Sequence, residues 1–520
     1  MSEVKKLKFF AGGKWHESKA LKYMDIYNPS TGSVIARTPC CTEGEVKSAI
    51  KSAADAFPSW ANTPAMKRVQ VLYKFRELLD KHLDELTELV CRENGKVWEE
   101  AKGDVLKAKE ATELACGIPS LLMGESLMNA SSGFDTVLYK EPVGVFAGIA
   151  PFNFPAMIPM GWMMPLCIAT GNTLVLKAAS MTPMTAMRCA ELLQESGLPD
   201  GVVNIVTCSR SEAELFLKHP DVKGVTFVGS TSIGMHIYAT AAANGKRVQA
   251  LCEAKNHALV LEDAPLERTA RGIINAAFGC AGERCMALPV VVVQKSIADK
   301  LVELLVKFAG ELKVGPAYDK ASELGPVVTE NHRQFVLSKI EKGIAEGAKL
   351  VLDGRSAIVK GFENGFYLKP TIFDQVTPEM TIGSEEIFGP VLCIKRVSDF
   401  EEGLQIMNNN KFANGSVIFT QSGYFSREFA NRTHGGMVGI NVGIPVPIGS
   451  FPFTGHKNSF FGDLHALGKD GIRFFTETKA VTSRWFDDAD MKQQKVDTWD
   501  GTMVRSPAYP NIQLGDLTGS

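Results

Sequence analysis

Apolar and polar positions alternate regularly from residue 173 onward. Short apolar runs that are typical of buried strands occur at residues 173–176, 202–206, 224–228 and 247–251. Amphipathic segments with helical spacing separate them, at residues 183–194, 211–218 and 232–243. Strands that alternate with helices form a parallel sheet covered by its crossover helices, so this region predicts a doubly wound α/β domain.

The same alternation resumes after residue 256. Residues 257–261 and 289–294 have the composition of strands, and residues 266–278 and 298–312 have the spacing of helices. We therefore expect a second α/β domain, with the domain boundary near residues 254–256. Ahead of both domains, residues 45–114 are helical in character, and residues 138–150 predict strands around a turn at 141–144.

Composition narrows the classes of function. The chain has 520 residues, 45% hydrophobic and 22% charged, with a formal net charge of −2. This balance gives no basic surface for nucleic acid or a membrane, and apolar runs such as residues 289–293 are too short to cross a bilayer. Residues 1–10 carry no targeting pattern, so the expected location is cytoplasmic.

The 11 cysteines are scattered and form no CxxC pair. Neither a metal site nor a disulfide framework is expected, and most of these thiols should be reduced and buried. Beyond Trp485 the composition becomes polar and irregular. We expect that tail to be mobile or held only by another subunit.

One cysteine stands in a loop suited to catalysis. Residues 279–286 read G-C-A-G-E-R-C-M and connect a predicted helix to a predicted strand. A nucleophilic thiolate needs a lowered pKa, which the neighbouring Arg284 could provide for Cys285, and Gly282 allows a close backbone approach. The alternative is that Cys285 is an ordinary buried cysteine, as most free cysteines are.

Further segments carry a resemblance to a known family. They read A-P-F-N-F-P at residues 150–155, L-K at 176–177, F-V-G-S-T at 227–231, E-I-F-G-P at 386–390 and F-P-F-T-G at 451–455. Together with the Cys285 loop, and in this order, they make the chain resemble the aldehyde dehydrogenase superfamily over about residues 7–487. Any one of these segments alone would be weak evidence.

The resemblance implies a role for each segment. Asn153 and the backbone N–H of Cys285 should stabilise the alkoxide that forms when sulfur attacks an aldehyde. Hydride then leaves to a nicotinamide, and a thioester remains on Cys285. The cofactor contacts implied are Phe152, Lys177, Ser180, Gly229, Ser230, Glu386 and Phe388. Among these, the helix start at Ser230 should receive the pyrophosphate, and Lys177 and Glu386 should bind the two riboses.

The stretch at residues 251–255, L-C-E-A-K, indicates a branch of the superfamily. Hydrolytic members carry a glutamate base at the position of Leu251, so this chain lacks that base and a thiol such as coenzyme A should take the acyl group. Residues 254–257, 282–287, 460–463 and 474–479 resemble the CoA-acylating methylmalonate/malonate-semialdehyde dehydrogenases. In that branch the acyl group loses CO₂ before its transfer.

Three departures from this branch affect specificity. Two arginines hold the substrate carboxylate there; Arg284 matches one, but Lys107 replaces the other and lacks its bidentate fork. Glu253 stands where the family has glycine, and we do not favour it as a substitute base. Ser180 replaces the usual glutamate, so the sequence leaves NADP open beside NAD.

The implied fold class is α/β, with two doubly wound domains and a small β oligomerisation element. The expected division is an NAD(P)-binding domain of residues 1–123 and 144–254, a catalytic domain of 255–450, an arm of strands from 124–143 and 466–487, and a polar tail of 488–520. Such arms favour a homodimer or a homotetramer. The alternatives left open are a different aldehyde, hydrolysis to a free acid, and a non-catalytic family member.

Overall fold

A parallel sheet forms the centre of the larger lobe. The computed structural model describes residues 4–131, 133–486 and 490–492. The sheet order is β2 (Lys14–His16), β1 (Phe9–Ala11), β9 (Val203–Val206), β8 (Thr173–Lys177), β7 (Val145–Ile149), β10 (Val222–Val228), β11 (Arg247–Leu251) and β21 (Phe460–Gly462). The five strands from β9 to β11 are parallel, and antiparallel strands close both edges.

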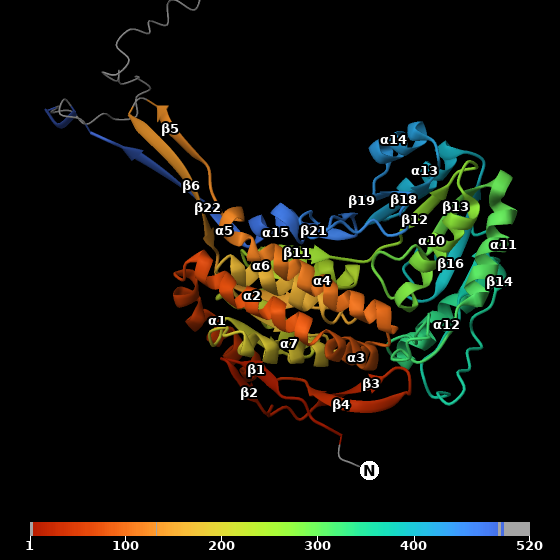
Figure 1. Cartoon of the computed structure of the whole chain (residues 1–520), viewed down its shortest axis with the longest axis horizontal. Coiled ribbons are helices and arrows are strands. Elements are labelled where there is room, and N and C mark those ends of the chain that lie inside the picture. The colour runs from red at the N-terminus through yellow and green to blue at the C-terminus, as the bar shows by residue number, and fades with distance from the viewer. Residues whose placement is uncertain (1–3, 132, 487–489, 493–520) are drawn as a thin grey trace, which may run out of the picture.

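Helices cover both faces of this sheet, as the alternating pattern predicts (Figure 1). One face packs against α1 (Glu43–Ala61), α8 (Arg210–Lys218) and α9 (Thr231–Ala243). The other packs against α2 (Ala65–Lys81), α3 (Leu83–Asn94), α4 (Trp98–Cys116), α6 (Met164–Ala169), α7 (Met184–Glu195) and α15 (Gly468–Phe474). Apolar residues such as Phe146 and Leu174 are fully buried between the layers, and their burial drives this packing.

The second lobe repeats this architecture. Its sheet order is β14 (Lys349–Leu352), β15 (Thr371–Asp374), β16 (Val391–Val397), β13 (Val290–Gln294), β12 (His257–Val260), β18 (Gly415–Phe419) and β19 (Met437–Ile440). Helices α10 (Leu266–Phe278) and α11 (Lys295–Glu311) cover one face. Helices α12 (Glu330–Ala345), α13 (Phe400–Asn409) and α14 (Gly423–Arg432) cover the other. We propose that the domain boundary lies between β11 and β12.

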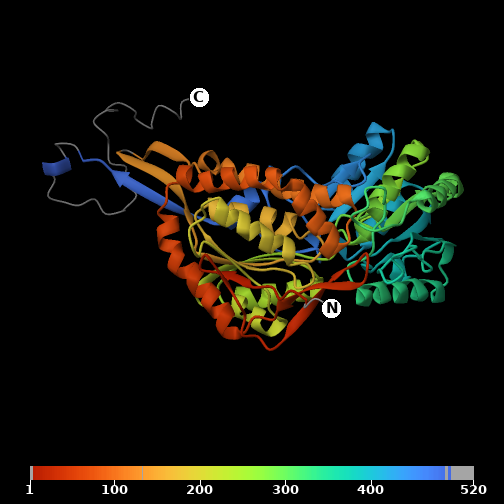
Figure 2. The ribbon, with the colours of Figure 1, turned by 60° about the horizontal axis from the view of Figure 1, so that its bottom comes forward.

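A three-stranded antiparallel arm projects from the larger lobe, at the end away from the second lobe (Figures 1 and 2). It consists of β5 (Ser126–Ser131), β6 (Phe134–Pro142) and β22 (Thr476–Arg484). The prediction of strand for 466–487 was wrong in its first part, because Gly468–Phe474 is the helix α15. Its residues Ile472 and Phe474 are buried in the core of the larger lobe.

An N-terminal hairpin of β3 (Tyr23–Asn28) and β4 (Ser33–Pro39) links the two lobes. The Ser30 hydroxyl accepts a hydrogen bond from the N–H of Ala317 at 3.0 Å, and the Tyr367 hydroxyl donates to the Ser30 carbonyl at 3.0 Å. Both partners belong to the second lobe.

In the described part of the chain, no helix is both long and apolar enough to cross a membrane. The predicted polar tail of 488–520 lies outside the described residues, except for residues 490–492.

Candidate active site

The Cys285 loop is bent by residues in unusual backbone conformations. After α10 the chain makes a 3-10 turn, Gly279–Gly282, in which Cys280 and Ala281 have φ of 53° and 52°. Gly282 has φ of +75°, and a Cβ there would lie 2.1 Å from the carbonyl oxygen of Gly389. Only glycine fits at this position, so the turn brings the Cys285 loop against the E-I-F-G-P segment.

Two asparagines fix the backbone around Cys285. The Asn256 side-chain amide donates to the carbonyls of Cys285 and Ala287, both at 2.8 Å, and its oxygen accepts from the N–H of Gly415 at 2.8 Å. The Asn414 amide donates to the Cys285 carbonyl at 3.3 Å. Neither Asn256 nor Asn414 could be assigned a role from the sequence, because their partners are distant in the chain.

The surroundings of Cys285 oppose ionisation of the thiol. The pKa of Cys285 is raised to about 12, mainly by burial and in smaller part by the charge of Glu386. The charge of Arg284 and the backbone N–H groups of Cys285 and Met286 lower the pKa, but by less. Arg284 acts in the expected direction, but the net pKa of the thiol is raised, because desolvation outweighs the cation.

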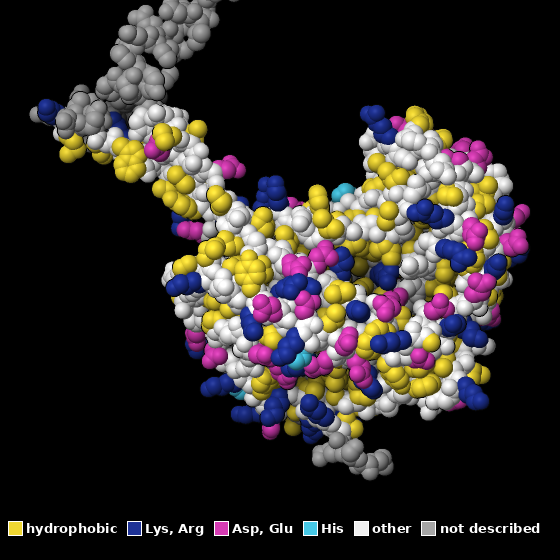
Figure 3. All heavy atoms as spheres, in the orientation of Figure 1, with side chains coloured by type: hydrophobic (Ala, Val, Ile, Leu, Met, Phe, Trp, Pro, Cys, Tyr) yellow, Lys and Arg dark blue, Asp and Glu magenta, His cyan; other side chains and the backbone are white. Residues whose placement is uncertain are grey.

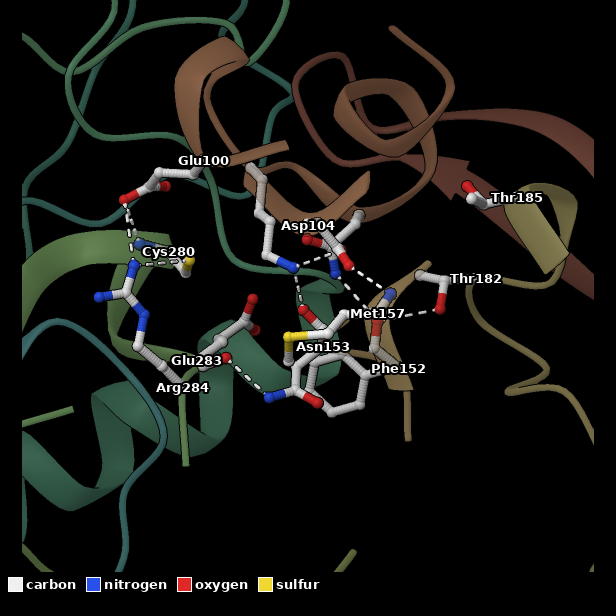
Figure 4. A network of polar contacts seen from close by, with 12 residues as sticks. Glu100, Asp104, Phe152, Asn153, Met157, Thr182, Thr185, Cys280, Glu283 and Arg284 are labelled. Atoms are coloured by element: carbon white, nitrogen blue, oxygen red, sulfur yellow. Dashed lines mark hydrogen bonds and ion pairs between the residues drawn. The ribbon is translucent and has the colours of Figure 1, made fainter. Parts of the chain in front are cut away.

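Asn153 lies directly beside the Cys285 loop (Figure 4). Its side-chain amide donates to the carbonyl of Glu283 at 3.1 Å. The buried Lys96 ammonium donates to the Asn153 carbonyl and to the Asp104 carboxylate, and Asp104 accepts from the N–H of Met157 at 2.7 Å. The Lys96–Asp104 ion pair thus positions the loop that carries Asn153. Neither Lys96 nor Asp104 could be assigned a role from the sequence.

Glu386 is a partly buried carboxylate whose charge acts on the Cys285 thiol. Its Oε1 accepts a hydrogen bond from the N–H of Ala254 at 3.0 Å. Burial raises the pKa of Glu386 to about 8; the Ala254 N–H lowers the pKa, and the negative charge of Glu253 raises it. The side chain is therefore an acid that is partly protonated near neutral pH.

Phe388 and Phe152 form an aromatic contact next to Glu386. Their ring centroids are 5.8 Å apart in an edge arrangement. Phe388 has φ of 58°, a conformation that few bulky residues adopt, and its carbonyl is 2.6 Å from Nε2 of His332. Such strain persists where the surroundings impose it, which here are the two rings and His332.

The remaining predicted cofactor residues lie at the ends of parallel strands in the larger lobe. Lys177 ends β8, and Ser180 lies in the turn between β8 and α7. Gly229 and Ser230 follow β10, and Ser230 is the N-cap of α9. Ligands of doubly wound sheets bind at these strand ends, so the placement suits a dinucleotide. One N–H at this helix start, that of Thr231, is bonded to the Glu253 carboxylate at 3.0 Å.

A cavity of about 390 Å³ joins Cys285 to the two predicted substrate cations. Arg284 and Lys107 both line it, together with Phe154 and Trp162. Each cation already has an acidic partner. Nη2 of Arg284 is 3.8 Å from Glu100 and 3.2 Å from the Cys280 sulfur, and Nζ of Lys107 is 2.5 Å from Glu110. Figure 4 shows Arg284 between Glu100 and Cys280.

Comparison with known proteins agrees with this geometry. A model of the aldehyde dehydrogenase family matches residues 15–481. The chain belongs to the aldehyde dehydrogenase family.

Relatives within this family have narrower names. The chain is 49% identical to malonate-semialdehyde dehydrogenase 1 of Geobacillus thermodenitrificans, over 93% of this chain and 99% of the relative. It is 50% identical to malonate-semialdehyde dehydrogenase 2 of Geobacillus kaustophilus, with the same coverage.

Solved structures give the same picture. The methylmalonate-semialdehyde dehydrogenase of Oceanimonas doudoroffii matches with a TM-score of 0.92 and 42% identity, over 94% of this chain and 100% of that one. An aldehyde dehydrogenase from Bacillus cereus, solved as an NAD⁺ complex, matches with a TM-score of 0.88 and 32% identity, over 92% and 97% of the two chains. The expected α/β fold of the aldehyde dehydrogenases is thereby confirmed.

Leu251 is the residue that the resemblance places at the position of the base of hydrolytic aldehyde dehydrogenases. It is 5% exposed, it ends β11, and its carbonyl accepts from the N–H of Gly229 at 3.0 Å. Glu253 lies beyond the end of that strand, and its carboxylate accepts a hydrogen bond from the N–H of Thr231, the first residue of α9. The side chain at the base position therefore has no group that could take a proton from water.

The donors and acceptors that the two lobes offer fit an aldehyde dehydrogenase cofactor with one exception. Lys177 offers a cation, Glu386 offers an acceptor, and α9 offers a helix start that attracts anions. The exception is Glu253, which places a negative charge at that helix start.

Proposed function

We propose that this chain oxidises malonate or methylmalonate semialdehyde through a thioester on Cys285, and that after loss of CO₂ it passes the acyl group to coenzyme A. The products are acetyl-CoA or propionyl-CoA. The observation that carries the proposal is the single cavity shared by the Cys285 thiol and two cations, Arg284 and Lys107. An aldehyde that bears a carboxylate has complementary charge. The names of the relatives support the same substrate class.

The first half of the reaction forms the thioester. Once deprotonated, the Cys285 sulfur adds to the aldehyde carbon, and the carbonyl oxygen becomes an alkoxide. The Asn153 amide and the backbone N–H of Cys285 donate hydrogen bonds to that oxygen. NAD, when bound, supplies the hydride acceptor. The Lys96–Asp104 pair and the Asn256 amide hold the two donors in place.

The second half transfers the acyl group. The C–C bond to the carboxylate, which Arg284 and Lys107 hold, breaks and CO₂ leaves. The electron pair of that bond stays on the α-carbon as a thioester enolate, which takes up a proton from water. The thiol of coenzyme A then loses its proton to water and attacks the thioester carbonyl as a thiolate. The bond to sulfur breaks, and the Cys285 thiolate is released. Leu251 supports a thiol rather than water as the attacking group, because an apolar side chain cannot activate water.

We propose NAD as the cofactor, by analogy with the Bacillus cereus relative. Phe152, Lys177, Ser180, Gly229, Ser230, Glu386 and Phe388 would contact it. Ser180 carries no charge that would repel a 2′-phosphate, so NADP belongs in the same experiments. We further propose that the exposed arm joins subunits in a homodimer or a homotetramer.

The test is product analysis with and without coenzyme A. Malonate and methylmalonate semialdehyde are incubated with enzyme and NAD or NADP, and products are identified by mass. We expect acetyl-CoA or propionyl-CoA only when coenzyme A is present, and no product from the Cys285→Ala variant. Free acid formed at an equal rate without coenzyme A would contradict acyl transfer.

A second candidate function has support in the cavity itself. Glu100 lies beside Arg284, and Glu110 lies beside Lys107. These carboxylates compete with a substrate carboxylate for the two cations, which favours an aldehyde without one. A higher kcat/KM for propionaldehyde than for both semialdehydes would support this candidate.

A further inference from the structure

Glu253 is half-buried at the start of α9 and has no part in the proposed reaction. Its Oε2 accepts a hydrogen bond from the backbone N–H of Thr231 at 3.0 Å. Thr231 is the first residue of α9, where N–H groups have no partner within the helix. The partial positive charge of a helix start attracts anions, and Glu253 provides one from within the chain.

The fold holds Glu253 at this place. The N–H of Cys252 donates to the Ser459 carbonyl at 2.8 Å, and the Ser459 hydroxyl donates to the Glu253 carbonyl at 2.7 Å. The Thr231 hydroxyl donates to the Asn458 carbonyl at 3.1 Å. Residues 458–459 are thus bonded both to the segment after β11 and to the start of α9.

The contact between α9 and this segment is close. A Cβ at Gly234 would lie 2.2 Å from the Cys252 sulfur, so the helix approaches at a distance that only glycine allows. Gly234 therefore serves close packing between α9 and the segment after β11. The backbone therefore brings the Glu253 side chain to the first turn of α9.

A second carboxylate faces the same segment. Glu386 accepts from the N–H of Ala254, the residue after Glu253, and the charge of Glu253 contributes to raising the pKa of Glu386. A dinucleotide that binds here brings two further negative charges on its diphosphate. Like charges at short range oppose each other, and they do so more strongly where water is partly excluded.

We propose that Glu253 determines the affinity for the cofactor: its carboxylate occupies the start of α9 in the cofactor-free enzyme and competes with the dinucleotide diphosphate for the same N–H groups. The inference rests on the proposed function, which places a dinucleotide at α9. The chain should therefore bind the dinucleotide more weakly than the same chain with a neutral residue at position 253.

The decisive variant is Glu253→Gln in the full-length protein. Glutamine keeps an oxygen that accepts from Thr231 but removes the charge. Dissociation constants for NAD and NADP are measured by calorimetry, without aldehyde. We expect tighter binding of the preferred dinucleotide by about ten-fold, the size expected for one like charge at a partly hydrated site. The melting temperature without cofactor should fall, because α9 loses its anion.

The affinity for the dinucleotide should rise while the melting temperature falls. General damage to the fold would instead lower both the affinity and the melting temperature, so the two explanations can be told apart. The control is Glu363→Gln, which removes one exposed carboxylate from a loop of the second lobe and should leave the affinity unchanged. Glu253→Gly, which removes the whole side chain, should also tighten binding and serves if the glutamine variant is insoluble.

Each other outcome overturns the inference. An affinity within about two-fold of the parent would show that the charge has no effect on the cofactor. Weaker binding in both variants would make Glu253 a favourable contact of the cofactor instead. If neither parent nor variants bind NAD or NADP while the control melts normally, the proposed function fails and this inference fails with it.

Discussion

At the scale of single residues, the electrostatics of Cys285 lead to a prediction about its reactivity. Burial and Glu386 hold the pKa of the thiol at about 12, so the thiolate fraction below that pH rises with pH. Alkylation of Cys285 by iodoacetamide in the cofactor-free chain should be slow at pH 7 and accelerate about ten-fold per pH unit. Peptide mass spectrometry across pH 7 to 10 measures the rate at this cysteine.

The variant Glu386→Gln tests the contribution of the Glu386 charge in the same alkylation measurement. At pH 9, Glu386 carries its charge, because this pH is above its pKa of about 8. Removing that charge should lower the pKa of Cys285 and speed its alkylation. If the alkylation rate of the parent chain has already stopped rising with pH before pH 8 is reached, the result would contradict the raised pKa of Cys285.

The second prediction at this scale concerns substrate charge. Lys107 binds Glu110 through a compact ammonium, whereas an arginine would hold a carboxylate with two parallel hydrogen bonds. Under the proposed function, Lys107→Arg should lower the KM for malonate semialdehyde by about five-fold, which is about 1 kcal/mol of binding. The KM for propionaldehyde, which has no carboxylate, is the control and should not change. An equal change for both aldehydes would show that the residue does not bind a carboxylate.

At the scale of elements, the contact between the Cys285 loop and the E-I-F-G-P segment gives the third prediction. Gly282→Ala would place a Cβ 2.1 Å from the Gly389 carbonyl oxygen, at a φ of +75°. Strain of this kind costs about 1–3 kcal/mol, and the loop that bears Cys285 must also shift. We expect a lower melting temperature and at least a hundred-fold loss of kcat, in keeping with the roughly 10²-fold cost of ~1 Å misplacement in an active site.

Gly310→Ala is the control for that variant. Gly310 lies in α11 with open space around its Cα, so the added methyl group meets no atom. Alanine is more favourable than glycine in a helix by about 1 kcal/mol, and the melting temperature should stay or rise. Similar losses in both variants would show that the contact at Gly389 has no special importance.

Local patterns predicted the alternating strands and helices between residues 173 and 312, but not the long-range partners of these elements. The periodicity at 211–218 and 266–278 identified α8 and α10, because burial of one helix face leaves a clear signal in the sequence. The helix α15 was predicted as strand because its seven residues are too few to show helical spacing. The three residues of β21 were not predicted, because they form a strand only by pairing with β11, about 200 residues earlier.

In the active site, too, residues within recognisable segments were predicted, and residues that act through distant partners were not. Cys285 and Asn153 were predicted from the segments that contain them, and they lie on adjoining loops. Lys96, Asp104, Asn256 and Asn414 were not predicted as positioning residues, because each acts through a partner far away in the chain. Arg284 lowers the thiol pKa as expected, but the sequence could not show that burial outweighs it, since desolvation depends on the complete fold.

At the scale of the whole molecule, the exposed arm gives the fourth prediction. Tyr139 and Val481 lie on one face of its sheet and are 52% and 38% exposed. In the view of Figure 3, apolar side chains lie along the arm, beside a hollow between the arm and the second lobe. Apolar residues on a projecting arm indicate an interface between subunits.

Val481→Asp should therefore shift the protein to a smaller species by light scattering after gel filtration, because a buried charge without a partner is costly. Ile358→Asp is the control. It adds the same charge at an apolar residue that is 79% exposed in a loop of the second lobe. A parent chain that is already monomeric would contradict the role of the arm.

The pairing of β21 with β11 also has a consequence for synthesis of the chain on the ribosome. The second lobe is encoded between these two strands, so β11 remains an unpaired edge while about 200 residues are added. At ~5–20 residues per second this lasts roughly 10–40 s. Exposed edges promote aggregation, so the nascent chain is most vulnerable in this interval, and slower translation of the second lobe should lower the yield of native enzyme.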